Sequence, residues 1–135
     1  MITRQEYIDY LLKLKDKKII KVITGIRRCG KSTLFKLYKD YLLKSNISEE
    51  QIISLNFENP SDMQFNNWRE LYTYIEKKLI FGKMNYIFLD EVQMLKNFEK
   101  AIDGLFIKDN VDIYITGSNS YMLSGELATY LTGRY

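Results

Sequence analysis

Apolar residues along this chain follow two spacings, one typical of buried strands and one typical of helices. Short runs rich in β-branched and aromatic residues predict four strands, at residues 19–24, 51–57, 86–89 and 111–116. Before and between these runs, apolar residues recur every three to four positions and predict four helices, at residues 7–14, 34–42, 65–79 and 98–106. Strands and helices therefore alternate along the chain.

This alternation is typical of an α/β fold in which a parallel sheet is covered by helices on both faces. The crossovers between parallel strands are expected to be right-handed, which gives three layers. Ligands of such sheets bind at the carboxyl ends of the strands. With 135 residues and no Pro- or Gly-rich linker, the chain is expected to form one domain over residues 1–135.

Composition narrows the chemistry that this chain can perform. Hydrophobic residues make up 46% and charged residues 27%, a balance typical of a soluble globular protein. No apolar run is long enough to span a bilayer, so we expect a cytoplasmic protein that does not use a membrane. A net charge of +3 gives no strong case for nucleic acid. The lack of histidine and the single cysteine, Cys29, exclude a zinc site and a histidine-based catalytic triad.

The segment from Gly25 to Ser32 fits the pattern G-x-x-x-x-G-K-[ST] of a phosphate-binding loop. It follows a predicted strand and precedes a predicted helix, which is the context that this motif requires. Gly25 and Gly30 let the backbone wrap around a phosphate with its N–H groups pointing inward. Lys31 is expected to neutralise the β- and γ-phosphates, and the Ser32 hydroxyl to bind Mg²⁺. A glycine-bounded turn with an exposed lysine is the alternative.

Two adjacent carboxylates, Asp90 and Glu91, follow the apolar strand at 86–89 in the arrangement of a Walker B motif. Asp90 is expected to hold Mg²⁺, directly or through water, because this hard cation prefers oxygen ligands. Glu91, on the other side of the strand, is the predicted catalytic residue that orients the water attacking the γ-phosphate. Alone, such a pair is often a solvated turn, but beside a phosphate loop it favours nucleotide hydrolysis.

Further polar residues are candidates for contact with the γ-phosphate or the attacking water. Asn119 and Ser118 follow the fourth predicted strand, where a polar turn is an equal alternative. Asn56 ends the second predicted strand and is a candidate to hydrogen-bond Glu91, although a plain strand-end role is the simpler explanation. Arg134 is the candidate for the positive charge that phosphoryl transfer needs, with an arginine from a neighbouring subunit as the alternative.

Three side chains inside the loop are ambiguous. Arg27 and Arg28 are placed to contact the nucleotide, but solvent, a partner or nucleic acid is an equal alternative. Cys29 lies beside the predicted phosphate position, so its alkylation is expected to block nucleotide binding without any catalytic role for the thiol.

With these motifs the chain resembles the ATP-binding domain of prokaryotic AAA-type P-loop ATPases. The resemblance covers nearly the whole chain and rests on segments 25–33, 56–60, 88–93, 116–120 and 131–135, so that Thr33 joins the nucleotide-binding residues. It implies ATP rather than GTP, dependence on Mg²⁺, oligomeric assembly, and a fourth strand placed between the first and third. Members usually continue with a closing strand and a C-terminal domain of nuclease-like fold. We therefore expect a truncated nucleotide-binding core.

The sequence thus predicts an enzyme that binds Mg-ATP and hydrolyses it to ADP and phosphate, driving an unknown partner or conformational change. A small-molecule kinase is the second hypothesis, although the segment after the fourth strand is short and has one arginine. The third is a nucleic-acid-binding module switched by nucleotide, which would use Arg27, Arg28 and the lysines at 13, 15, 17, 18 and 21.

Overall fold

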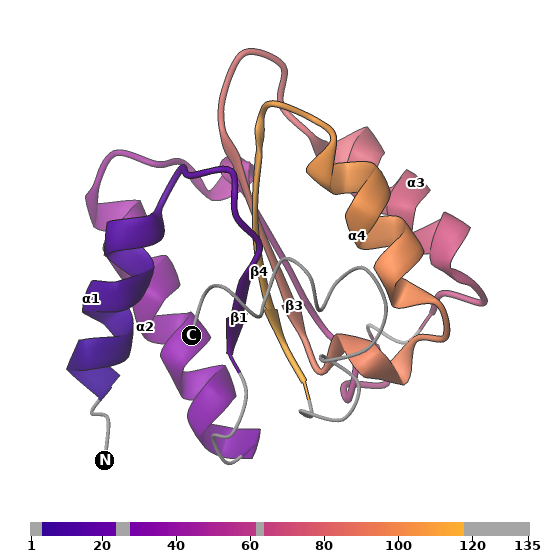
Figure 1. Ribbon diagram of the computed structural model, residues 1–135, viewed down its shortest axis with the longest axis horizontal. Helices are drawn as coiled ribbons and strands as arrows, with labels where there is room; N and C mark the ends of the chain where they lie inside the picture. Colours follow the sequence, from indigo (N-terminus) through magenta and orange to yellow (C-terminus); the bar gives the residue numbers. More distant parts are fainter. Residues whose placement is uncertain (1–3, 24–27, 62–63, 118–135) are drawn as a thin grey trace.

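The computed structural model describes residues 4–23, 28–61 and 64–117 of the chain, with the backbone alone for residue 4 and residues 28–32 (Figure 1). Within these ranges four strands form one parallel sheet in the order β1-β4-β3-β2. The strands are β1 (Lys21–Ile23), β2 (Ile52–Asn56), β3 (Asn85–Asp90) and β4 (Val111–Thr116). The α-helices are α1 (Arg4–Leu14), α2 (Arg28–Lys44), α3 (Trp68–Lys78) and α4 (Phe98–Phe106). Two 3₁₀ turns are η1 (Glu49–Gln51) and η2 (Val92–Met94).

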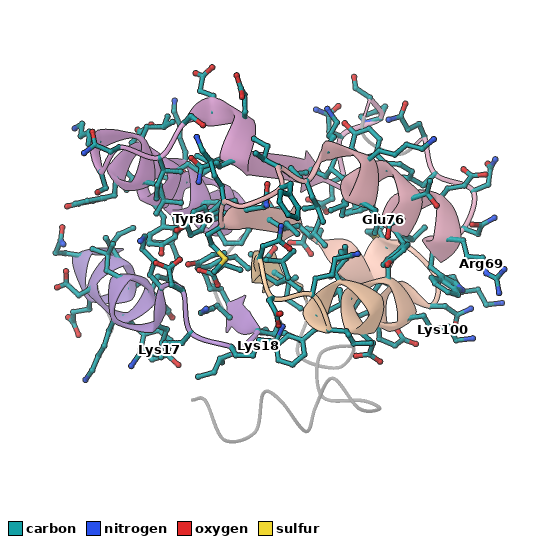
Figure 2. All side chains as sticks on the ribbon, turned by 90° about the horizontal axis from the view of Figure 1, so that it is seen from above. Lys17, Lys18, Arg69, Glu76, Tyr86 and Lys100 are labelled. Carbon is teal, nitrogen blue, oxygen red and sulfur yellow. The ribbon has the colours of Figure 1, made fainter. Side chains whose placement is uncertain are left out.

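The sheet separates two pairs of helices. α1 and α2 cover one face of the sheet, and α3 and α4 cover the other. Both Figure 1 and Figure 2 show this arrangement. The expected three-layer α/β fold is therefore confirmed, as is the position of the fourth strand between the first and the third. None of the helices within the described ranges combines the length and the apolar character that crossing a membrane requires.

Side chains of each strand alternate between two cores, one under each pair of helices. In β3, Ile87 and Leu89 pack into the core shared with α3 and α4. Tyr86 and Phe88 pack instead into the core shared with α1 and α2. Asp90, two residues beyond Phe88, therefore faces the layer that contains α2.

Aromatic rings dominate the core between the sheet and α2. The rings of Phe88 and Tyr114 stack across β3 and β4 with centroids 4.8 Å apart. Tyr38 of α2 lies over both rings, and its hydroxyl is 2.7 Å from that of Tyr114. Phe35, one turn earlier in α2, meets Phe88 edge to face at 5.2 Å. These contacts fix α2 against the strand that carries Asp90.

A buried polar cluster joins the strands near their amino ends. Lys21 of β1 donates hydrogen bonds to Asp112 of β4 and, at 2.8 Å, to the carbonyl of Lys17. Asp112 also accepts from the hydroxyl of Tyr114 at 2.7 Å and from the backbone N–H of Asp16 at 2.9 Å. Burial lowers the pKa of Lys21 and raises that of Asp112, because it disfavours either charge. The pair holds the segment that connects α1 to β1.

Several predicted boundaries differ from the structure by one to six residues, among them the starts of β1 and α3. β1 begins at Lys21, whereas the apolar run starts at residue 19. α3 begins at Trp68 because the side chain of Asn67 caps it, accepting from the Glu70 N–H at 3.0 Å. Phe65, predicted in the helix, lies in the preceding loop and packs edge to face on Tyr74 at 5.2 Å.

Candidate nucleotide-binding site

The amino end of α2 lies directly after β1 and the residues of the predicted phosphate loop. The helix begins at Arg28, so Lys31 and Ser32 belong to its first turns, while Gly25 and Arg27 lie outside the described residues. The first turn of α2 contains no acidic residue. No carboxylate in this turn therefore competes with an anion for its N–H groups and for the positive end of the helix dipole.

Three polar residues end the strands on the face that α2 covers. Asn56 ends β2 and pairs with Asp90 in the sheet register, and Thr116 ends β4. Thr116 has the same parity in its strand as Tyr114, which packs against α2. The carboxyl ends of neighbouring parallel strands thus bring oxygen-bearing side chains to the same edge of the sheet as the start of α2.

The hydroxyl of Thr116 connects the two predicted acidic residues. Its oxygen accepts a hydrogen bond from the backbone N–H of Glu91 at 2.9 Å, and it is also within hydrogen-bond distance of Asp90 Oδ1. A hydroxyl has one proton, and an ionised carboxylate can only accept, so Thr116 donates to Asp90. Asp90 and Glu91 are both only 6% exposed. The sequence analysis included Thr116 in the polar segment 116–120 but named Asn119 and Ser118, not Thr116, as candidates.

Glu91 leaves the strand in a left-handed backbone conformation, with φ 56° and ψ 45°. Among the described residues, the other non-glycine residues with positive φ are Asp16, Asn46 and Asn97, types that tolerate this region better. Strand alternation therefore ends at Asp90 and does not orient Glu91. Instead, Glu91 Oε1 accepts a hydrogen bond from Gln93 Nε2 at 2.8 Å. Strained backbone of this kind is typical of functional sites.

The remaining predicted residues are only partly placed. Asn56 accepts from the Glu58 N–H at 3.0 Å and so caps its own turn. Thr33, half-buried in α2, is the first loop residue with a described side chain. The side chains of Arg28, Cys29, Gly30, Lys31 and Ser32, and the whole of Ser118, Asn119 and Arg134, lie outside what the structure describes.

Lys39 is a cation near this site that the sequence did not single out. It lies two turns beyond Lys31 on α2, and its Nζ donates to Ser54 Oγ of β2 at 2.8 Å. Burial lowers the pKa of Lys39, while the charge of Asp90 opposes this shift. Lys39 follows Lys31 by eight residues, about two helical turns, which places both on one helix face. This spacing could have identified Lys39 from the sequence.

The basic run proposed for nucleic acid is not a continuous solvent-exposed face. Lys21 is 2% exposed and paired with Asp112, so it cannot contact a ligand from solvent. Lys17 and Lys18 are exposed, as Figure 2 shows. The Nζ of Lys18 donates a hydrogen bond to the backbone carbonyl of Lys108 at 2.6 Å. Burial of one member weakens the case for this run as a nucleic-acid surface.

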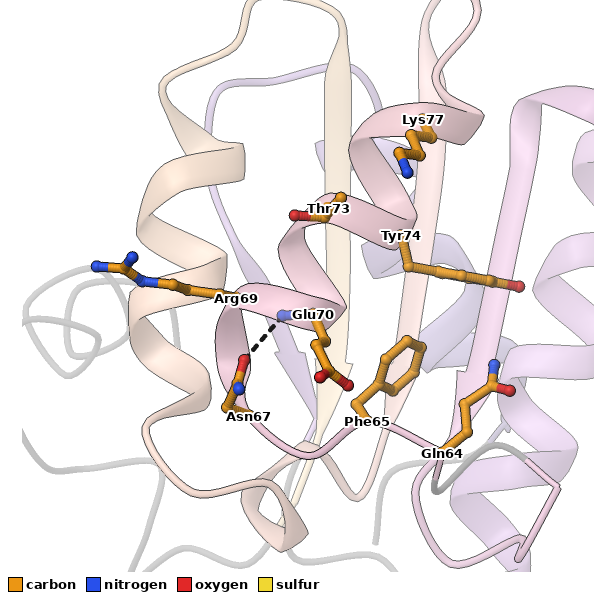
Figure 3. A pocket seen from close by; sticks show the side chains of 8 residues that line it. All are labelled: Gln64, Phe65, Asn67, Arg69, Glu70, Thr73, Tyr74 and Lys77. Carbon is orange, nitrogen blue, oxygen red and sulfur yellow. Dashed lines mark hydrogen bonds between the residues drawn. The ribbon is translucent and has the colours of Figure 1, made fainter.

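An open groove of about 690 Å³ lies along α3 (Figure 3). Phe65 and Tyr74 contribute aromatic rings to it, and Arg69, Glu70 and Lys77 contribute charges of both signs. Its lining includes none of the residues that the sequence assigned to nucleotide or magnesium. The groove therefore shares no residue with the candidate nucleotide-binding site at the end of β3.

The oxygen donors at the end of β3 suit a magnesium ion that also binds water and phosphate. They do not suit a metal whose ligands all come from protein side chains. Within the described ranges, no three His, Cys, Asp or Glu side chains gather in a way that could hold a metal ion. One buried carboxylate, Asp90, is fixed on one oxygen by Thr116. A hard cation that keeps several waters and shares its coordination with phosphates needs only one or two such protein ligands. Asp90 with Ser32 would supply them.

Comparisons with known proteins agree with this geometry. A family model described as an AAA domain matches residues 17–135. An uncharacterized protein of Haemophilus influenzae is 41% identical over 136 residues, an alignment that covers 100% of this chain and 34% of that protein. Uncharacterized protein MJ1544 of Methanocaldococcus jannaschii is 34% identical over 131 residues, covering 93% of this chain and 27% of that protein. This chain thus spans about a third or less of each relative's length.

The fold also matches a solved structure. PCH-2 of C. elegans superposes with a TM-score of 0.59 at 19% sequence identity, over 94% of this chain and 40% of that one. At this identity the likeness supports the fold alone. The family match, by contrast, includes both the phosphate-loop segment and the Asp90-Glu91 pair. The chain therefore belongs to the AAA domain family of P-loop ATPases.

Proposed function

We propose that this chain binds Mg-ATP and hydrolyses it to ADP and phosphate, with Glu91 orienting the attacking water. The observation that carries this proposal is the adjacent buried acidic residues Asp90 and Glu91, linked by one Thr116 hydroxyl that donates to the Asp90 carboxylate and accepts from the Glu91 backbone N–H. Asp90 ends β3, and Glu91 follows it, at the edge of the sheet where α2 begins. A carboxylate fixed in this way is suited to metal binding, and its neighbour to accepting a proton from water.

Each residue has a separate role in this proposal. Gly25, Gly30 and the first N–H groups of α2 surround the phosphates, and Lys31 neutralises them. Ser32 and Asp90 hold magnesium, whose chemistry is to neutralise charge on the phosphates during transfer. Arg27, Arg28, Cys29 and Thr33 complete the nucleotide contacts, while Asn119 and Arg134 act at the γ-phosphate.

Hydrolysis suits the acidic pair better than transfer to a small acceptor. A kinase must exclude water from the phosphate that it transfers. Two adjacent carboxylates beside the metal would instead favour activation of water. We further propose that hydrolysis drives a conformational change or a partner, in a homo-oligomer or with another protein. These functions would also involve the rest of the longer relatives, of which this chain spans 34% and 27%.

The proposal is tested by measuring binding and turnover separately. Calorimetry would give the affinity for Mg-ATP, and a phosphate-release assay the turnover, for the parent, Lys31→Ala and Glu91→Gln. We expect Lys31→Ala to lose binding, and Glu91→Gln to keep binding while turnover falls by roughly a hundredfold or more. Lys36→Ala, an exposed lysine of the same helix, and Glu50→Gln, an exposed glutamate, are the matched controls.

Three outcomes would contradict the proposal. Absence of Mg-ATP binding by folded parent protein would remove the nucleotide site. Equal turnover in Glu91→Gln and the parent would remove Glu91 as the residue that orients water. Faster ATP consumption with a small-molecule acceptor than with water would favour the kinase instead.

A further inference from the structure

Gln93 is in direct contact with the residue to which catalysis is assigned. Its Nε2 donates to Glu91 Oε1 at 2.8 Å, across the 3₁₀ turn η2 that follows β3. Because Glu91 is in the left-handed region, its side chain does not continue the alternation of the strand. The hydrogen bond from Gln93 is therefore a specific restraint on where the carboxylate lies.

The turn that carries Gln93 is fixed to the protein core. Val92 and Leu95, on either side, are buried and pack in the core under α3 and α4. The backbone N–H of Met94 donates to the Glu91 carbonyl at 3.2 Å, and that of Leu95 to the Val92 carbonyl at 3.0 Å. A donor on a short, anchored turn holds its partner more tightly than one on a free loop.

The other end of the Gln93 amide has no hydrogen-bond partner among the residues that the structure describes. Its Oε1 is buried, and no hydrogen bond reaches it within the described part of the chain. Turning the amide over would place Oε1 against the Glu91 carboxylate, where two acceptors would face each other. The orientation is thus dictated by Glu91, at the cost of a buried acceptor left unsatisfied.

We propose that Gln93 is a positioning residue that holds the Glu91 carboxylate in the orientation needed to direct the attacking water. This inference rests on the proposed function, because it assigns the purpose of the contact to hydrolysis. The hydrogen bond from Gln93 to Glu91 Oε1 fixes the plane of the carboxylate. The amide contributes to turnover through Glu91, to which it is hydrogen-bonded.

The test compares Gln93→Met, which keeps the length of the side chain without its hydrogen bonds, with Gln93→Glu, which replaces the donor by a carboxylate. In both variants we expect the turnover number to fall by about tenfold or more, because the carboxylate is no longer oriented. The Kd for Mg-ATP should stay within about twofold of the parent value. The thermal midpoint of Gln93→Met should equal or exceed that of the parent, since an unsatisfied buried acceptor is removed. Gln64→Met, at an exposed glutamine, is the control.

A double variant tests whether Gln93 acts through Glu91. In a Glu91→Gln background, Gln93→Met should cause no further loss in single-turnover rate, because the carboxylate it positions is already gone. Unchanged or faster turnover in Gln93→Met, or a parallel loss of affinity and thermal stability, would overturn the inference while the proposed function stands. Equal turnover in Glu91→Gln and the parent, or no turnover in the parent, would instead overturn the proposed function and the inference that rests on it.

Discussion

Thr116 and Asp90 end neighbouring strands and share a hydrogen bond in which the threonine hydroxyl is the donor. The same oxygen accepts from the backbone N–H of Glu91 at 2.9 Å. One hydroxyl therefore fixes both the side chain of the predicted magnesium ligand and the backbone that turns Glu91 out of the strand. Since Thr116 is fully buried, water cannot replace either contact.

Thr116→Val is expected to destabilise the fold by about 1–3 kcal/mol, because it leaves a buried carboxylate oxygen and a buried N–H without their shared partner. Turnover should also fall, since Asp90 and Glu91 both lose a restraint. Chemical denaturation and phosphate release measure the two effects. Thr116→Ser keeps the hydroxyl and should retain most of both properties, and Thr73→Val, at an exposed site, is the control. A valine variant as stable and as active as the parent would contradict this role.

The strand ends could be predicted from the sequence, but the Thr116 contact could not. Apolar runs located β3 and β4 to within a residue or so. In the structure, strand alternation places Asp90 and Thr116 on the same face as Phe88 and Tyr114. Periodicity does not tell which strands are neighbours. β4 is last among the described strands and yet lies between β1 and β3, an order that came from the family resemblance. Only this order brings the Thr116 hydroxyl to Asp90.

Glu91→Gly is expected to remove turnover without lowering stability as much as the loss of a buried side chain normally would. Glycine adopts φ near 56° without the steric cost that glutamate has there, about 1–2 kcal/mol. Thermal unfolding and phosphate release should therefore change independently. Glu99→Gly, in the first turn of α4, lacks this relief and is expected to lose stability because glycine weakens a helix by roughly 0.5–1 kcal/mol. A Glu91→Gly protein that is much less stable than Glu99→Gly would contradict the strain argument.

Lys21→Met is expected to destabilise the fold by about 3–5 kcal/mol, because Asp112 would stay buried without its cation. Adding Asp112→Asn should recover part of the loss, since the asparagine oxygen can still accept from Tyr114 and from the Asp16 N–H without a charge. Denaturant titration measures both. Lys18→Met, at a neighbouring exposed lysine, should change the free energy of unfolding by less than about 0.5 kcal/mol. A loss in Lys21→Met no larger than in Lys18→Met would contradict the assignment.

The sequence could not separate Lys21 from the other lysines of its run. All lie within a few residues of each other, and a lysine inside a short apolar run can reach solvent or be buried in an ion pair. Its partner, Asp112, is 91 residues away and lies in a strand predicted from apolar residues. The pairing depends on β1 lying beside β4, in the register that places Lys21 next to Tyr114.

Asp16→Asn is expected to reduce stability at neutral pH by less than about 1 kcal/mol, because the pair of Asp16 with Lys15, at 2.8 Å, is partly exposed. Asparagine tolerates the left-handed backbone of this position, so the change removes the charge without adding strain. It also keeps an oxygen for the hydroxyl of Tyr86, which donates to Asp16 at 2.7 Å. The change therefore isolates the contribution of the charge.

The pH dependence of this difference follows from the pKa of Asp16. Partial burial acts to raise that pKa, but the hydrogen bonds from Lys15 and Tyr86 outweigh it and hold the pKa below its ordinary value of 3.8. A lowered pKa in the folded state stabilises the protein above pH 3.8, and this contribution is lost as the pH falls through the folded value. Denaturation curves between pH 7 and pH 3 should thus show the parent and Asp16→Asn converging at the acid end. Asp40→Asn, at an exposed position of α2, should not reproduce this convergence, and a gap that widens on acidification would show that Asp16 is stabilised by being protonated.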